Sequence, residues 1–145
     1  MRTVAAISRL VALLALASVP AFAQAREPIG TSSPTLTPAI RVGNMVYGSG
    51  QLGVRRDSPD TTIQGQTKAA LENIKKVFEQ AGTTMELAVK CTVFLVELED
   101  FQGMNQAYRE FWPSAPPARS TVVVKALVVP GAKVEIECIA VMPAK

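Results

Sequence analysis

The sequence predicts an α+β domain in which a single mixed β-sheet carries both of its helices on one face. Its 145 residues, 48% of them hydrophobic, match one domain with a buried core. Two amphipathic helical stretches alternate with β-branched runs, in the order strand, strand, helix, strand, helix, strand, strand. Residues 88–95 and 122–124 are apolar on both sides, which predicts that the helix-free face is covered by self-association.

Residues 1–25 have the three parts of a secretory signal peptide. A basic start precedes a short apolar run at 10–17, and small residues allow cleavage after Ala23 or Ala25. The run is shorter than the ~20 apolar residues of a membrane span. We therefore expect residues 26–145 to form a periplasmic or secreted domain with no membrane partner.

The basic character of the whole chain comes mostly from this leader. The leader holds two of the 15 basic residues and none of the 12 acidic ones. The remaining 13 basic and 12 acidic residues leave a net charge of +1. Such a small charge argues against nucleic acid as a partner.

The domain begins with an arm and two short strands. Residues 26–38 are rich in Pro, Ser and Thr and predict an extended arm. Two strands are expected at 39–42 and 45–49, with a turn at the Gly43-Asn44 pair between them. The polar stretch 54–62 that follows predicts a loop.

The most regular part of the sequence is a helical pattern that follows this loop. Apolar residues recur every three or four positions from Ile63 to Ala81, and charged residues occupy the other side. Gly82 is the residue type expected where such a helix ends. The β-branched, apolar run 88–95 then predicts a buried strand.

A second helix and two strands complete the predicted order. Asp100 lies where an N-cap is expected, and aromatic residues follow at helical spacing until Pro113. This aromatic stripe is typical of core or subunit-interface packing. A stiff connector at 113–118 leads to strands at 120–127 and 133–142.

The composition limits the chemistry that the chain can carry out. There is no histidine, which excludes Ser-His-Asp and Cys-His nucleophilic sites, histidine-ligated metals and imidazole acid–base catalysis. Cys91 and Cys138 are too few for a disulfide framework or a cysteine-only zinc site. Their apolar surroundings predict two buried, slowly reacting free thiols. An oxidising compartment would also permit one bridge.

A small set of polar residues lies at strand ends and on the second helix: Arg119, Glu135, Ser49, Gly50 and Asn105. One interpretation of Arg119 and Glu135 is an ordinary ion pair or a solvated strand face. The other is an arginine that binds a small carboxylate through two parallel hydrogen bonds, close to a glutamate that holds a water molecule. Spacing alone leaves both interpretations open.

Five segments of the domain carry a family resemblance. They are GNMVYGSGQLG (43–53), QTKAALENIKKVFEQAG (66–82), VKCTVFLVELEDFQGMNQAYREFW (89–112), PPARSTV (116–122) and VEIECIAV (134–141). The segments run in order, without large gaps, through nearly the whole domain. On these residues, the stretch 39–142 resembles the RidA family of reactive intermediate deaminases, also called the YjgF family.

The resemblance implies a chorismate-mutase-like homotrimer with three clefts, each lined by two neighbouring subunits. It implies a hydrolase that converts imines and enamines of small amino acids, such as 2-aminoacrylate, to 2-oxo acids and ammonia without a metal or cofactor. Arg119 would bind the substrate carboxylate, and Glu135 would orient and deprotonate the attacking water. Further substrate-binding positions would be Ser49, Gly50, Asn105 and Thr121.

The sequence departs from the family pattern at several points. Many deaminating members carry a Gly-Pro-Tyr tyrosine in the arm, where this chain has Thr35 or Leu36. Thr121 stands where the family has a cysteine two places after the arginine. An export signal also departs from a family whose usual substrates arise in the cytoplasm. The departures leave the substrate range open, and without the phenol we expect a more open or more apolar cleft.

Two other function classes compete with an exported deaminase. A non-catalytic trimeric protein that binds small carboxylates would use the same cleft and Arg119, but it would not need Glu135. RNA cleavage, claimed for some family members, is disfavoured by the small charge, the missing histidine and the export signal.

Overall fold

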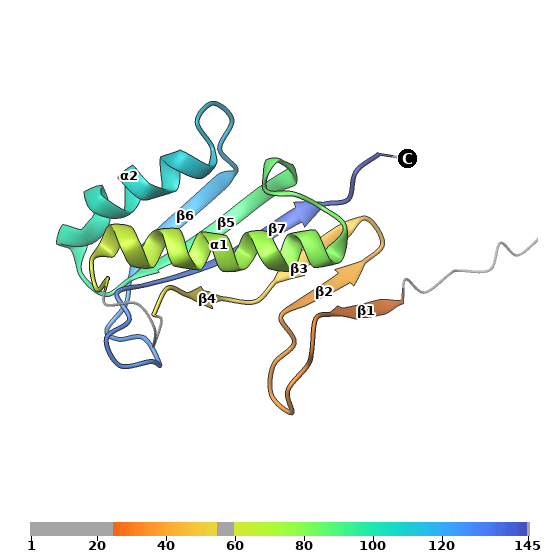
Figure 1. Cartoon of the computed structure of the whole chain (residues 1–145), viewed down its shortest axis with the longest axis horizontal. Helices are drawn as coiled ribbons and strands as arrows, with labels where there is room; N and C mark the ends of the chain where they lie inside the picture. The colour runs from red at the N-terminus through yellow and green to blue at the C-terminus, as the bar shows by residue number, and fades with distance from the viewer. Residues whose placement is uncertain (1–24, 55–59, 145) are drawn as a thin grey trace, which may run out of the picture.

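The computed structural model describes residues 25–54 and 60–144 (Figure 1). The expected signal peptide, apart from Ala25, and residues 55–59 of the predicted loop lie outside the described residues. The elements are β1 (Arg26–Ile29), β2 (Ala39–Val42), β3 (Met45–Gly48), β4 (Gln51–Leu52), α1 (Ile63–Ala81), η1 (Met85–Leu87), β5 (Ala88–Leu95), η2 (Leu98–Asp100), α2 (Phe101–Phe111), β6 (Ala118–Val123) and β7 (Val134–Val141). Among the helices described, none combines the length and apolar character needed to cross a membrane.

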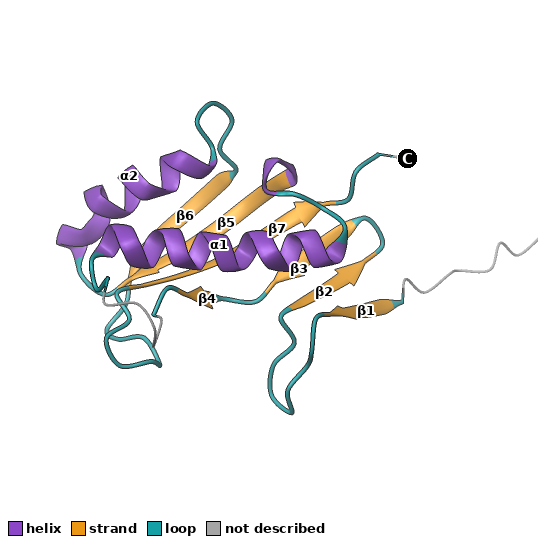
Figure 2. Cartoon of the chain, viewed as in Figure 1, coloured by secondary structure: helices purple, strands orange, loops and turns teal. Residues whose placement is uncertain are grey.

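The strands form one sheet in the order β1-β2-β3-β7-β5-β6, with β4 paired to β7. Neighbouring strands are antiparallel except β5 and β6, which are parallel and joined by a crossover that contains α2. Both helices lie on the same face of the sheet (Figures 1 and 2). The predicted fold class, a single mixed sheet with both helices on one face, is confirmed.

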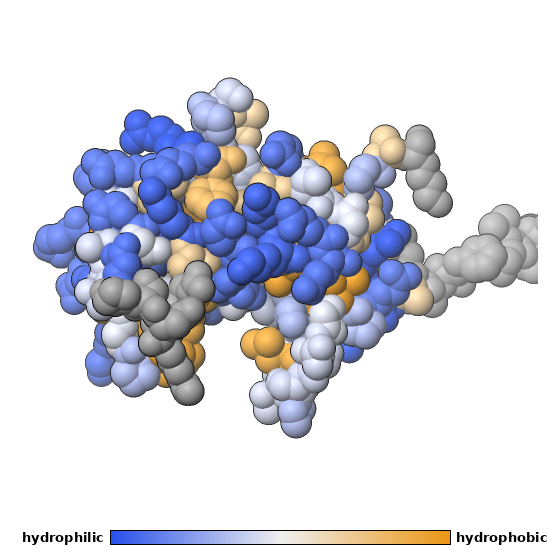
Figure 3. All heavy atoms as spheres, in the orientation of Figure 1, coloured by the Kyte–Doolittle hydropathy of each residue, from blue (hydrophilic) through white to orange (hydrophobic). Residues whose placement is uncertain are grey.

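Helix α1 forms where the sequence predicts it, because both of its ends are capped. The hydroxyl of Thr62 accepts a hydrogen bond from the backbone N–H of Gly65 at the first turn. At the other end Gly82 has φ 81°, a left-handed conformation that favours glycine. The apolar stripe is buried on the sheet, while the charged residues make the hydrophilic surface in the middle of Figure 3.

Asp100 precedes α2 as predicted, but its carboxylate makes no capping hydrogen bond. The short turn η2 gives Asp100 helical backbone angles (φ −74°, ψ −10°), whereas a capping side chain needs an extended backbone. The carboxylate pairs instead with Lys133, with 3.2 Å between Oδ2 and Nζ. This ion pair joins the start of α2 to the residue before β7.

The strands differ from the prediction most clearly at the two edges of the sheet, and β4 was not predicted. The expected arm contains β1, which pairs with β2 at one edge of the sheet. Strand β6 ends at Val123 rather than Leu127, because it lies at the opposite edge and its partner β5 ends at Leu95. β-Propensity alone could not indicate where a partner strand ends.

Cys91 and Cys138 are joined by a disulfide bond. The two residues lie opposite each other in the antiparallel register of β5 and β7, with their Cα atoms 4.1 Å apart. The expectation that both are buried is confirmed, but the prediction of two free thiols is wrong. Forty-seven positions separate the cysteines in the chain, so only the strand register brings them together.

The two faces of the sheet differ in their covering. Val93, Val134 and Ile136 are fully buried beneath the helices. Alternate residues point to the other face, where Tyr47 and Val122 are both 45% exposed in the single chain. The helix-free face is open in the single chain but only partly apolar, because Lys90, Thr92, Glu135 and Glu137 share it with Tyr47 and Val122.

Candidate active site

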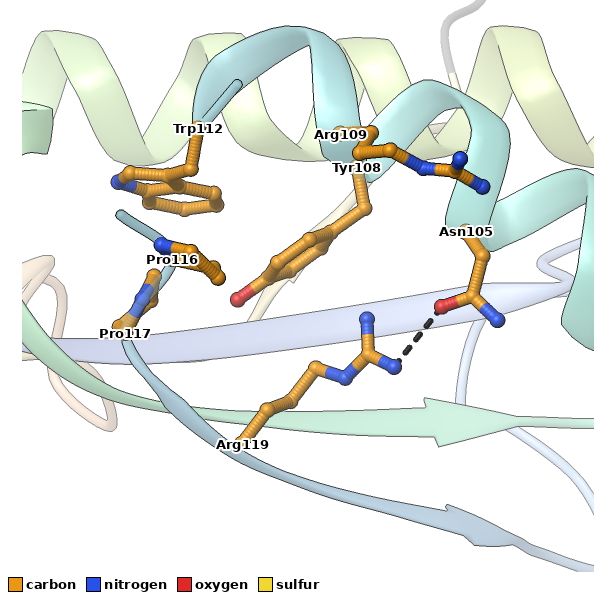
Figure 4. A pocket seen from close by; sticks show the side chains of 7 residues that line it. All are labelled: Asn105, Tyr108, Arg109, Trp112, Pro116, Pro117 and Arg119. Atoms are coloured by element: carbon orange, nitrogen blue, oxygen red, sulfur yellow. Dashed lines mark hydrogen bonds between the residues drawn. The ribbon is translucent and has the colours of Figure 1, made fainter. Parts of the chain in front are cut away.

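Arg119 lies on the edge strand β6 and points toward α2 (Figure 4). Its register partner on β5 is the buried Cys91, so Arg119 lies on the helix-covered face of the sheet. The guanidinium donates a hydrogen bond to Oδ1 of Asn105 at 2.8 Å, and its Cζ lies 4.7 Å from the centre of the Tyr108 ring. The amide and the aromatic face together hold the guanidinium in one orientation.

Two buried hydroxyl groups on this side of the sheet, those of Tyr108 and Thr121, have no hydrogen-bond partner among the described residues. Thr121 follows Arg119 by two positions, on the same face of β6. Burial raises the pKa of Tyr108 to about 12, against the opposing effect of the Arg119 charge, so the phenol is protonated at neutral pH. Buried polar groups are normally paired, which sets these two hydroxyls apart from the rest of the core.

A cleft of about 410 Å³ opens beside Arg119. This volume lies within the range of small-molecule sites. The lining residues are Asn105, Tyr108, Arg109, Trp112, Pro116, Pro117 and Arg119 (Figure 4). We call Arg119, Asn105, Tyr108 and Thr121 the arginine cluster. Its chemistry suits a ligand with a carboxylate group.

Glu135 belongs to a second cluster, which β4 and β7 hold together. Glu135 pairs with Leu52 in the register of these strands, and its carboxylate packs against the backbone of Gly50. A Cβ atom at position 50 would overlap the Glu135 carboxylate, so the carboxylate can lie here only because residue 50 is glycine. The Ser49 hydroxyl donates a hydrogen bond to the carbonyl of Thr37 at 2.7 Å, which ties the arm to the end of β3. We call Ser49, Gly50 and Glu135 the glutamate cluster.

The two clusters lie on opposite faces of the sheet. Glu135 lies between Val134 and Ile136, which are both fully buried beneath the helices, so its side chain points to the other face. Arg119 points toward α2 on the helix-covered face. One chain therefore does not bring the two predicted catalytic residues together, and a site that uses both requires two copies of the chain.

The aromatic residues of the cleft could be located only in part from the sequence. The stripe on the second helix predicts core packing, and Tyr108 and Trp112 are indeed only 4% exposed. Their place in the wall of the cleft was missed. A signal was available, because Tyr108 follows Asn105 by three positions and Trp112 follows Tyr108 by four, which puts all three on one side of the helix.

Comparison with known proteins decides the family. Residues 27–142 match the protein family described as Endoribonuclease L-PSP. The chain belongs to this family, the RidA (YjgF) family. Some members of the family are named as deaminases, in agreement with the deaminase activity that the resemblance implies.

Two RidA-family relatives illustrate the range of names. The 2-iminobutanoate/2-iminopropanoate deaminase of Dermatophagoides farinae is 41% identical over 121 residues, which are 81% of this chain and 91% of the relative. Protein mmf2, mitochondrial, of Schizosaccharomyces pombe is 39% identical over 105 residues, which are 70% of this chain and 83% of the relative.

A solved RidA-family structure has the same fold. The crystal structure of E. coli TdcF with bound serine is 31% identical and has a TM-score of 0.73. The match covers 81% of this chain and 99% of that chain.

Proposed function

We propose that this RidA-family protein hydrolyses the C=N bond of 2-imino acids and releases 2-oxo acids and ammonia. The observation that carries the proposal is the guanidinium of Arg119, held beside a cleft by Asn105 and Tyr108. Its planar donors match the two oxygens of a carboxylate. The similarity to the D. farinae deaminase supports the same reaction class.

The proposed reaction needs orientation and one proton relay. Arg119 holds the substrate carboxylate. The imine is protonated at nitrogen, and its carbon then faces a water molecule bound to Glu135. Glu135 accepts a proton as the water oxygen bonds to that carbon, and a tetrahedral amino alcohol forms. Glu135 gives that proton to the nitrogen, the C–N bond breaks to release ammonia, and the C=O bond forms as the hydroxyl proton passes to Glu135, which returns it to solvent. One imine and one water thus become one 2-oxo acid and one ammonia.

The working unit in this proposal is a homotrimer in which the arginine cluster of one subunit faces the glutamate cluster of the next. The position of the clusters on opposite faces supports this arrangement, as do the exposed apolar side chains of Tyr47 and Val122. Light scattering of the protein without residues 1–25 should give the mass of a trimer. A monomer at micromolar concentration would contradict the proposal.

The proposed location is the periplasm or the exterior of the cell. The composition of residues 1–25 supports export. Because one relative is named as mitochondrial, the location needs a direct test. Fractionation of the native host should recover the protein outside the cytoplasm, with its N-terminus at Gln24 or Arg26. A cytoplasmic protein that retains residues 1–25 would contradict export.

Turnover can be measured with 2-aminoacrylate and longer imines generated in situ, by following the release of 2-oxo acids. Glu135→Gln keeps the side-chain shape but cannot accept a proton, so we expect turnover to fall about 100-fold while 2-oxo acid binding persists. Glu137→Gln is the matched control, because Glu137 is exposed two positions further along β7.

The outcomes separate the candidate functions. Undiminished turnover by Glu135→Gln would refute the proposed mechanism. Binding of 2-oxo acids by the wild type without turnover of any imine would favour the non-catalytic carboxylate-binding protein.

A further inference from the structure

We infer that the cleft beside Arg119 is built for a large apolar or aromatic side chain. The preferred substrates are then 2-imino acids derived from amino acids such as phenylalanine or leucine, rather than from alanine or serine. This inference rests on the proposed function and assigns the substrate class of the same site. The observation behind the inference is that the cleft has a cationic end and an aromatic end.

The cationic end of the cleft fixes where the carboxylate binds. Arg109 and Arg119 both line the cleft, and Figure 4 shows their guanidinium groups around the amide of Asn105. Nη2 of Arg119 donates to Oδ1 of Asn105 and Nη1 donates to the sulfur of Met104, while the remaining N–H groups of the guanidinium have no partner among the described residues. A carboxylate at this end places the rest of the molecule toward Trp112 and the prolines.

The aromatic end provides a rigid apolar wall. The rings of Tyr108 and Trp112 lie 4.7 Å apart between centroids, and the Trp112 indole N–H donates a hydrogen bond to the carbonyl of Met85 at 2.8 Å. Pro116 and Pro117 form the facing wall (Figure 4). Because these side chains are already held in place, little conformational entropy is lost when an apolar group binds between them.

The charge distribution selects against a polar substrate side chain. Among the seven lining residues, the charged groups are those of Arg109 and Arg119, and no charged group lies at the aromatic end. The methyl group of an alanine-derived imine would leave that end unfilled. Tyr108 and Trp112 are each 4% exposed, so a phenyl or isobutyl group would meet the exposed edges of these rings and Pro116 and displace water from that apolar surface, which favours binding.

The test compares imines of alanine, phenylalanine and aspartate, generated in situ, on the full mature chain. We expect kcat/KM for the phenylalanine-derived imine to exceed that for the alanine-derived one by about tenfold or more. Pro116→Trp places a large ring at the exposed mouth of the aromatic end. It should lower the phenylalanine value about tenfold and the alanine value much less, so that the ratio of the two values falls.

The matched control is Ser114→Trp, which adds the same ring to the same connector at an exposed position that does not line this cleft. It should change neither value. Circular dichroism checks the folding of both variants. A measurement that needs no variant is calorimetric binding of pyruvate, phenylpyruvate and oxaloacetate to the wild type, in which phenylpyruvate should bind most tightly.

The outcomes distinguish this inference from the proposed function. Equal kcat/KM values, a preference for the aspartate-derived imine, or an unchanged preference in Pro116→Trp would overturn the substrate class while leaving deaminase activity intact. If no imine is hydrolysed but phenylpyruvate binds most tightly, the deaminase proposal fails and the side-chain assignment stands. If pyruvate binds as tightly as phenylpyruvate, the assignment fails.

Discussion

Arg119 shows how neighbouring residues can prepare one side chain for binding. Asn105 holds one of its nitrogens, Tyr108 lies against its face, and its Nη1 is 3.9 Å from the sulfur of Met104. These contacts determine the plane of the guanidinium before a ligand arrives. Lysine carries the same charge but has neither a plane to stack nor two parallel donors.

Replacement of Arg119 should therefore depend on geometry as well as on charge. Arg119→Ala should weaken 2-oxo acid binding roughly 10- to 100-fold, the scale of a lost charged hydrogen bond, and remove most turnover. Arg119→Lys should restore little of either. Calorimetry and steady-state kinetics measure both effects, with the exposed Lys125→Ala as a control for lost positive charge. Full activity in Arg119→Lys would show that charge alone is sufficient.

Gly50 offers a second test at the scale of a residue. Gly50→Ala introduces a Cβ where the Glu135 carboxylate lies, so the carboxylate must move. We expect turnover to fall about as far as in Glu135→Gln, roughly 100-fold. Binding of 2-oxo acids at Arg119 should persist, and thermal unfolding should report an intact fold. Wild-type kinetics in Gly50→Ala would mean that the position of Glu135 is not critical.

At the scale of secondary-structure elements, the disulfide joins β5 and β7 at the centre of the sheet. These two antiparallel strands are paired from Ala88 opposite Ala140 to Leu95 opposite Val134. Cys91 is fully buried and Cys138 is 1% exposed, so a reductant in solution cannot reach the sulfurs of the folded chain. The bond therefore belongs to the core.

The bond should raise stability by constraining the unfolded chain. In the chain-entropy treatment, a disulfide that closes a loop across 47 positions raises the free energy of unfolding by about 4 kcal/mol. The Cys91→Ala/Cys138→Ala double variant should consequently unfold on the order of 10 °C lower than the oxidised wild type. Wild type that is reduced while unfolded and then refolded is the control, and it should resemble the variant. Two free thiols in the native protein, found by non-reducing mass spectrometry, would contradict this prediction.

At the scale of the whole molecule, the proposed function depends on how copies of the chain assemble. Arg119 faces the helices and Glu135 faces away from them, so each chain carries two half-sites that point apart. In the proposed trimer, each half-site would meet the complementary half-site of a neighbouring copy.

Mixed oligomers test this arrangement directly. Arg119→Ala and Glu135→Gln chains should each be nearly inactive as pure proteins. After joint refolding in equal amounts, about a quarter of the clefts should combine an intact Arg119 with an intact Glu135, and activity should return to that extent. Native mass spectrometry confirms the mixing. Efficient mixing without any recovery of activity would show that the two residues do not share a cleft.

Those elements whose signals are local could be predicted from the sequence. The period of apolar residues and the terminal Gly82 define α1 within a few neighbouring positions, and the run 88–95 is itself β5. Asp100 was predicted as a cap from its position alone. The preceding turn η2 changes its backbone angles, and its carboxylate pairs with Lys133 from a distant part of the chain.

By itself, the sequence determined the fold class, the order of both helices and of the five strands other than β1 and β4, the burial of both cysteines and the residue types at the candidate site. Periodicity, capping and composition act over a few neighbouring residues, so they can be read along the chain. Only the tertiary structure decided that Cys91 bonds to Cys138, that Tyr108 stacks on Arg119, and that Arg119 and Glu135 lie on opposite faces. Each of these depends on strand register and on the packing of α2 against β6. These in turn depend on contacts between segments far apart in the chain, which no local pattern specifies.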